Sequence, residues 1–171
     1  GGETAEMPGL YDKDDYDLAG FSLGAVEREE MLKGDLTRPG DVMLGIASNG
    51  LHSNGFSLVR QVIEQQGLSL DAPAPFDAGQ SLASALLAPT KIYVRSCLAA
   101  FRTGHVHGFC HITGGGLPEN MPRIMPDDVT AVFDMNSWKP APVFGWLSKA
   151  GNIVPTEMLR TFNCGIGMVV T

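Results

Sequence analysis

The chain has 171 residues, of which 44% are hydrophobic and 18% charged, a composition typical of one globular domain rather than of a disordered chain. Twelve Lys and Arg against 19 Asp and Glu give a net charge of −7, which disfavours general nucleic-acid binding because an acidic surface repels phosphate backbones. No apolar run approaches the roughly 20 residues of a membrane helix and no signal peptide is visible, so we expect a cytoplasmic protein without a membrane partner. Cys97, Cys110 and Cys164 lack the spacing of a disulfide framework or a metal site and are expected to be reduced, structural residues.

Turn residues and hydrophobic periodicity predict an alternation of strands and helices along the chain. Residues 1–15 are expected to be an irregular leader and 68–80 a surface loop. Strands are expected at 16–27, 42–47, 106–112, 129–135 and 165–171. Helices are expected from 56 to Gly67, at 82–87, at 90–102 with Thr90 as the N-cap, at 117–124 and at 143–150, with a short turn or helix at 158–162. The predicted class is α/β or α+β, with helices packed on a mixed β-sheet.

The strongest functional signal is the run Thr113-Gly114-Gly115-Gly116 between a predicted strand and a predicted helix. Glycine has no Cβ, so three in a row let backbone N–H groups converge on a ligand, and the start of the following helix adds partial positive charge. The run therefore predicts a phosphate site, with a plain flexible turn as the alternative. No Gly-Lys-Ser/Thr follows, so this is not a P-loop of the Walker type.

A second polar loop, residues 48–55, also joins a predicted strand to a predicted helix and contains His52-Ser53-Asn54-Gly55. Ser53 or Asn54 could simply cap the helix. Capping leaves His52 unexplained, whereas a loop histidine beside hydroxyl and amide groups could contact a phosphate.

Other polar residues give weaker signals. His105, His107 and His111 share parity and would lie on one face of a regular strand, but no carboxylate or further cysteine has a suitable offset, so no metal site is predicted. His111 precedes the glycine run by two residues and could line the same site. Glu3 and Glu6 could be acid/base groups or metal ligands, or carboxylates in solvent.

Six collinear segments carry a more specific pattern. They read Gly-Gly-Glu-Thr-Ala-Glu-Met-Pro-Gly (1–9), Tyr-Asp-Leu-Ala-Gly-Phe (16–21), His-Ser-Asn-Gly-Phe-Ser-Leu-Val-Arg (52–60), Leu-Leu-Ala-Pro-Thr-Lys-Ile-Tyr-Val (86–94), His-Ile-Thr-Gly-Gly-Gly-Leu-Pro-Glu-Asn-Met-Pro-Arg (111–123) and Arg-Thr-Phe-Asn-Cys-Gly-Ile-Gly-Met (160–168). Together they cover essentially the whole chain and closely resemble the phosphoribosylformylglycinamidine cyclo-ligases, also called aminoimidazole ribonucleotide synthetases.

The resemblance implies an ATP-dependent ring closure in purine biosynthesis, in which formylglycinamidine ribonucleotide and ATP give aminoimidazole ribonucleotide, ADP and phosphate. It also implies a homodimeric two-domain enzyme whose N-terminal domain supplies most ATP and Mg²⁺ ligands. Residues 1–15 would then be the end of that half or a linker, and residues 16–171 the C-terminal α/β domain, truncated at its C-terminal end. Such a fragment is expected to be inactive alone.

These signals combine into one candidate site. The expected catalytic residues are His52, Asn54 and His111. The residues expected to bind the substrate or its phosphate are Ser53, Gly55, Thr113, Gly114, Gly115, Gly116, Glu119, Asn120 and Asn163. Glu3 and Glu6 are expected near the nucleotide. The alternatives are a phosphate-binding, dimer-supporting module without chemistry, a domain like that of formylglycinamidine ribonucleotide synthetase, and a small-molecule kinase of the same superfamily.

Overall fold

The computed structural model describes residues 2–5, 12 and 17–171. The chain divides into two units, Gly1–Met31 and Leu32–Thr171. In the first, β1 (Gly2–Ala5) pairs with β2 (Asp17–Gly20) in an antiparallel ladder, and a 3-10 turn, η1 (Arg28–Glu30), follows. The prediction of an irregular leader over residues 1–15 is therefore wrong for residues 2–5, which form β1. The strand predicted over 16–27 ends at Gly20, because the ladder with β1 ends at the pair Gly2–Gly20.

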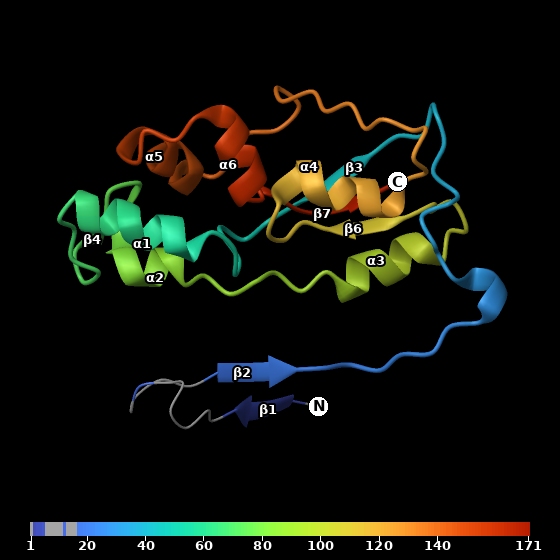
Figure 1. Cartoon of the computed structure of the whole chain (residues 1–171), viewed down its shortest axis with the longest axis horizontal. Coiled ribbons are helices and arrows are strands. Elements are labelled where there is room, and N and C mark those ends of the chain that lie inside the picture. The colour runs from blue at the N-terminus through green and yellow to red at the C-terminus, as the bar shows by residue number, and fades with distance from the viewer. Residues whose placement is uncertain (1, 6–11, 13–16) are drawn as a thin grey trace. The chain divides into compact units, whose positions relative to one another are not determined.

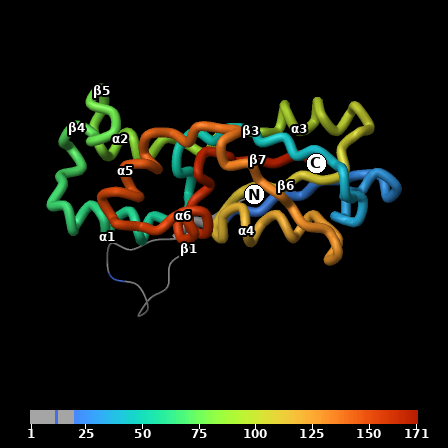
Figure 2. Tube along the Cα trace, turned by 90° about the horizontal axis from the view of Figure 1, so that it is seen from above, coloured from blue at the N-terminus to red at the C-terminus, as the bar shows by residue number. Residues whose placement is uncertain are grey.

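The second unit is built around a three-stranded sheet. Its order is β3 (Leu44–Ala47), β7 (Ile166–Val170) and β6 (Phe109–His111), and both pairings are antiparallel. The short helix α4 (Gly116–Asn120) lies on one side of the sheet and α3 (Val94–Phe101) on the other (Figures 1 and 2). The expected class, helices packed on a sheet, is confirmed. The sheet was expected to be mixed, but the strand pairs of the described residues are all antiparallel, as in an α+β domain.

A helical layer adjoins one end of the sheet in Figure 1. It consists of α1 (Phe56–Gln65), α2 (Leu82–Leu86), α5 (Pro142–Ala150), α6 (Pro155–Thr161) and the small hairpin of β4 (Pro73–Ala74) and β5 (Asp77–Ser81). Val59 and Val62 of α1 are fully buried with Leu147 of α5 and Phe162, as the spacing of apolar residues in these helices predicts. A second core under α4 contains Ile112 and Val169.

Four sequence predictions in this unit need correction. Segment 68–80 is not only a loop, since it contains β4 and most of β5. The strand expected at 106–112 is reduced to β6. The helix expected from Thr90 begins at Val94, with Tyr93 as the N-cap, because Lys91 bonds His52 of the 48–55 loop and the Tyr93 hydroxyl bonds Ala47 at the end of β3.

The fourth correction concerns residues 129–135, which form no strand. Ala131 and Phe133 are partly buried against the second core while Val132 is 80% exposed, so the alternation of apolar residues is real. The alternation of apolar and polar residues indicates which side chains face the core. A strand also needs backbone hydrogen bonds to a neighbouring strand. The part of the chain that the structure describes provides none for this segment. The helix predicted over residues 117–124 is found as two consecutive elements, α4 and the 3-10 helix η2 (Met121–Ile124).

The described residues include no helix that is both long and apolar enough to cross a membrane.

All three cysteines are free thiols. Burial raises the pKa of Cys110 and of Cys164 to about 11, so both remain protonated near neutral pH and act as small apolar residues.

Candidate functional site

The loop 48–55 folds around the imidazole of His52. His52 is only 4% exposed and has a left-handed backbone conformation, with φ of 59°. Its Nε2 atom accepts hydrogen bonds from the backbone N–H of Asn49 (3.0 Å) and of Lys91 (3.4 Å). The histidine therefore joins its own loop to the segment that precedes α3.

These contacts determine the protonation state of His52. Because Nε2 accepts two hydrogen bonds, the neutral ring carries its proton on Nδ1. Burial, with smaller contributions from His111 and Lys91, lowers the pKa of His52 below its usual value, so the ring is uncharged at neutral pH. Nδ1 is buried and has no hydrogen-bond partner among the described residues. His52 thus holds a buried N–H donor that no described residue satisfies.

Tyr93 is the main residue at this site that the sequence analysis missed. Its hydroxyl donates to the backbone oxygen of Ala47 (3.0 Å), and its ring centroid lies 6.2 Å from those of both His52 and His111. A Cβ at Gly167 would collide with the Tyr93 hydroxyl, so glycine on β7 makes room for it. The signal was present, since Tyr93 and Gly167 belong to two of the segments that carry the family resemblance.

The glycine run forms a turn that Asn120 holds from inside. The Nδ2 atom of Asn120 donates to the backbone oxygens of Gly116 (2.7 Å), Gly114 (3.1 Å) and Thr113 (3.4 Å), and its Oδ1 accepts from the Thr113 hydroxyl (3.1 Å). The carbonyl groups of the turn therefore point inward. The backbone N–H groups of Gly114 and Gly115 make no hydrogen bond within the described residues.

Backbone geometry explains why glycine is needed in this turn. Gly115 and Gly116 have φ of 91° and 57°, values that favour glycine. A Cβ at Gly116 would also collide with the backbone oxygen of Leu159 in α6. Since α4 has five residues, its helix dipole is small, and the partial positive charge expected from this helix start contributes little. The unpaired N–H groups of the turn remain the feature suited to an anion.

The two polar loops meet. A Cβ added at Gly114 would lie 3.8 Å from Oδ1 of Asn54, which places the Asn54 amide against the glycine turn. Helix α1 has Gly55 as its N-cap and no side-chain cap, so neither Ser53 nor Asn54 has the capping role that was the simple alternative. The Ser53 hydroxyl instead lies 3.5 Å from that of Thr90. Both loops therefore present polar groups that the fold itself does not use.

Asn163, at the end of α6, positions the 48–55 loop. Its Nδ2 donates to the backbone oxygens of Gly50 (2.9 Å) and Leu51 (3.2 Å), and its Oδ1 accepts from the N–H of Gly165 (2.8 Å). Asn163 and Asn120 are 0% and 1% exposed. The geometry makes both residues internal braces of the loops, not the ligand contacts that the sequence suggested.

The other predicted residues lie in varied surroundings. Glu119 is exposed and pairs with Arg160 of α6 (3.0 Å), and His111 is exposed on β6. His107 lies outside the strand and bonds Asp41 (2.6 Å), so the three histidines do not share a strand face. Glu3 belongs to β1 in the first unit, and Glu6 lies outside the described residues.

A pocket of about 390 Å³ opens beside His52. It lies between the 48–55 loop with the start of α1 and the segment 87–90, and Ser53, Arg60 and Thr90 are among the residues that line it. Arg60 makes no ion pair among the described residues, so the pocket has one available cation. These polar groups share the lining with apolar residues that include Phe56 and Leu87.

One comparison with known proteins assigns the chain to a family. Residues 38–171 match the family model described as "AIR synthase related protein, C-terminal domain". The matched region includes both polar loops, the braces Asn120 and Asn163, and all three strands of the central sheet. It confirms the resemblance at the level of the family: the chain belongs to the AIR synthase related proteins, as their C-terminal domain.

Proposed function

We propose that this chain is the substrate-binding domain of an ATP-dependent cyclo-ligase that closes the imidazole ring of formylglycinamidine ribonucleotide. The observation that carries the proposal is the convergence of the 48–55 loop and the glycine turn at Asn54 and Gly114. Both loops belong to segments that resemble the cyclo-ligases, and family membership supports an AIR synthase related activity.

Within this proposal the glycine turn binds the phosphate of the ribotide. The unpaired N–H groups of Gly114 and Gly115 donate to phosphate oxygens, and glycine allows the phosphate to approach the backbone closely. Asn120 keeps the carbonyl oxygens of the turn, which would repel an anion, directed inward. The Asn54 amide contacts the ligand from the opposite loop.

His52 acts in this proposal as a neutral hydrogen-bond donor. Its lowered pKa keeps it uncharged, and its unpartnered Nδ1–H would donate, once ligand binding exposes it, to an oxygen that gains negative charge during the reaction. His111 lies beyond Tyr93 and can orient the same ligand from β6. Tyr93 is a positioning residue, because it contacts both histidines and the end of β3.

ATP and Mg²⁺ are proposed to be held mainly outside this domain. Among the described residues no group of three His, Cys, Asp or Glu side chains could hold a metal ion. The ligands of Mg²⁺ are accordingly proposed to come mostly from the other domain and from the phosphates of ATP. In the complete enzyme, which the resemblance implies to be a cytoplasmic homodimer, ATP would supply the phosphoryl group that activates the formamide oxygen.

Calorimetric titration tests the proposal directly. The chain should bind formylglycinamidine ribonucleotide, and should bind the corresponding riboside without the 5′-phosphate at least about tenfold more weakly, since charge-assisted bonds to the turn would be lost. A Gly114→Val variant, whose side chain would crowd Asn54, should bind the two compounds equally weakly, while a Gly145→Ala variant, in open space on α5, should bind like the wild type. Equal binding of ribotide and riboside by the wild type would contradict the proposal.

A further inference from the structure

The carboxylate of Glu119 lies against the glycine turn. A Cβ added at Gly115 would lie 2.6 Å from Oε2 of Glu119 and 3.0 Å from its Cδ, so the missing side chain at Gly115 makes room for this carboxylate. The backbone N–H of Glu119 also bonds the Gly115 carbonyl (3.2 Å), which keeps the base of the glutamate side chain over the turn. The turn that is proposed to bind a phosphate therefore has a negative charge of the protein beside it.

Arg160 binds this carboxylate from the neighbouring helix. Helices α4 and α6 lie side by side (Figure 1), and the collision of a Cβ at Gly116 with the Leu159 carbonyl oxygen shows that α6 touches the turn one residue before Arg160. Nε of Arg160 donates to Oε1 of Glu119 (3.0 Å). The glutamate thus contacts the turn through Oε2 and the guanidinium through Oε1, so a single carboxylate separates this cation from the proposed phosphate site.

The ion pair is of the weak kind that a ligand can exchange. The side chains of Arg160 and Glu119 are 68% and 50% exposed, and their hydrogen bond uses Nε alone, whereas strong pairs of arginine and carboxylate are bidentate. A phosphate monoester accepts bidentate bonds from arginine and carries about two negative charges at neutral pH. A phosphate at the turn would repel the Glu119 carboxylate and attract Arg160 more strongly than that carboxylate does.

We propose that Arg160 is a further phosphate-binding residue of the ribotide site, and that Glu119 is an internal competitor which the phosphate displaces from it. This inference rests on the proposed function, because it requires the phosphate to bind the glycine turn. In the chain without ligand, Glu119 balances the charge of Arg160. When the ribotide binds, the guanidinium moves to the phosphate and the Glu119 carboxylate turns to solvent.

The exchange makes Glu119 a specificity-determining residue. Binding of any anion at the turn must give up the ion pair with Arg160, so an anion with a single charge gains little, whereas a phosphate dianion gains a stronger pair than the one that is lost. Glu119, which the sequence suggested as a ligand contact, therefore excludes weaker anions from the turn.

Calorimetric titration of two variants tests the exchange, with formylglycinamidine ribonucleotide and its riboside as probes. Glu119→Gln removes the competing charge and should bind the ribotide about threefold more tightly than the wild type. Arg160→Gln removes the cation and should bind the ribotide at least about tenfold more weakly. Neither substitution should change the affinity for the riboside, which has no phosphate. Because the pair is exposed, both variants should keep melting temperatures close to that of the wild type.

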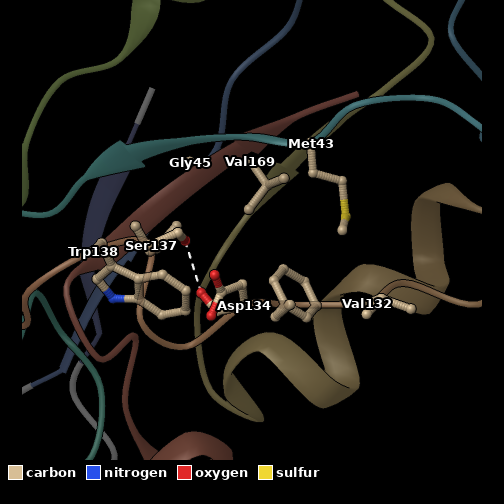
Figure 3. A pocket seen from close by; sticks show the side chains of 9 residues that line it. Met43, Gly45, Val132, Asp134, Ser137, Trp138 and Val169 are labelled. Atoms are coloured by element: carbon tan, nitrogen blue, oxygen red, sulfur yellow. Dashed lines mark hydrogen bonds between the residues drawn. The ribbon is translucent and has the colours of Figure 1, made fainter.

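Two further variants control for net charge. Asp134 is an exposed carboxylate next to Trp138 in a separate pocket of about 190 Å³ (Figure 3), whose lining includes no residue of the glycine turn, α4 or α6. Asp134→Asn removes the same charge as Glu119→Gln and should leave the ribotide affinity unchanged. Arg102→Gln, at the exposed C-cap of α3, is the corresponding control for Arg160→Gln.

Three results would overturn the inference. If the wild type prefers the ribotide and both variants keep that preference unchanged, the pair is an ordinary surface ion pair, and the proposed function stands without the exchange. Weaker ribotide binding by Glu119→Gln would mean that the carboxylate positions the arginine and does not compete with the ligand. If the wild type binds ribotide and riboside equally, the proposed function fails, and the inference fails with it.

Discussion

His52 shows how far a single residue could be interpreted from the sequence. Its place in a polar loop predicted a role at a site, but not that it is buried or that its Nε2 also accepts a hydrogen bond from Lys91, far along the chain. Such long-range contacts are not visible in local sequence patterns. The structure therefore adds a second role, in which the imidazole also supports the loop.

The lowered pKa of His52 predicts a pH dependence of stability. The unfolded chain binds a proton at His52 more readily than the folded chain, so stability should fall as the pH drops below about 6.5. Thermal unfolding between about pH 8 and pH 5 measures this effect. His52→Gln should lower stability at high pH and flatten the dependence, whereas exposed His105→Gln should retain the wild-type profile. An unchanged profile in His52→Gln would show that the pKa of His52 is not shifted by folding.

Two glycines provide a matched pair of substitutions. Gly116→Ala should lower the free energy of unfolding by at least about 3 kcal/mol, because the added Cβ would collide with the Leu159 carbonyl oxygen at a positive φ. Gly145→Ala, in helix α5 with no atom within 4 Å of the added Cβ, should be neutral or stabilising by up to about 1 kcal/mol. Denaturant unfolding compares them, and equal effects would contradict the close approach of α4 and α6.

At the level of elements, sequence periodicity located most helices but not the pairing of strands. Helices α1, α2 and α5 fall close to their predicted positions because apolar spacing and nearby glycine determine them locally. The segment 129–135 shows the opposite case, since its alternation is real and its strand partner is not found among the described residues. The start of α3 was predicted too early, because contacts of Lys91 with the 48–55 loop and of Tyr93 with the end of β3 precede the helix.

The glycine turn should depend on its internal brace. Asn120→Ala removes all four hydrogen bonds of that side chain, including the buried one to the Gly116 carbonyl, so stability should fall by about 1–3 kcal/mol. Binding of formylglycinamidine ribonucleotide should weaken as well, because the turn loses its conformation. Exposed Asn136→Ala should affect neither property. Weaker stability with normal ribotide affinity would place the phosphate elsewhere.

At the level of the whole molecule, the family match shows that the chain is an AIR synthase related C-terminal domain, whereas the ring-closure reaction is our proposal. The long collinear motifs indicated the family from the sequence, and the match over residues 38–171 confirms it. The choice of the cyclo-ligase reaction depends on a substrate site whose second half, in the resemblance, lies in another domain. Composition and periodicity contain no information on such a site.

The chain alone should therefore not catalyse ring closure. Positioning of both reactants supplies much of the rate of such a reaction, and the resemblance implies that most ATP and Mg²⁺ ligands lie in the other domain. A coupled assay of the purified chain with ATP, Mg²⁺ and formylglycinamidine ribonucleotide should detect no ribotide-dependent ADP release. Release that scales with chain concentration and is lost in the His52→Gln variant would contradict this expectation.

The central claim, that the two polar loops form one ribotide site, is tested most directly by heteronuclear NMR mapping of bound formylglycinamidine ribonucleotide. The account predicts that the amide signals of Gly114 and Gly115, the side-chain amide of Asn54 and the Nδ1–H of His52 shift together with one dissociation constant. Inorganic phosphate alone should shift only the glycine turn. Ribotide-induced shifts that leave residues 113–116 and 52–54 unchanged would contradict the account.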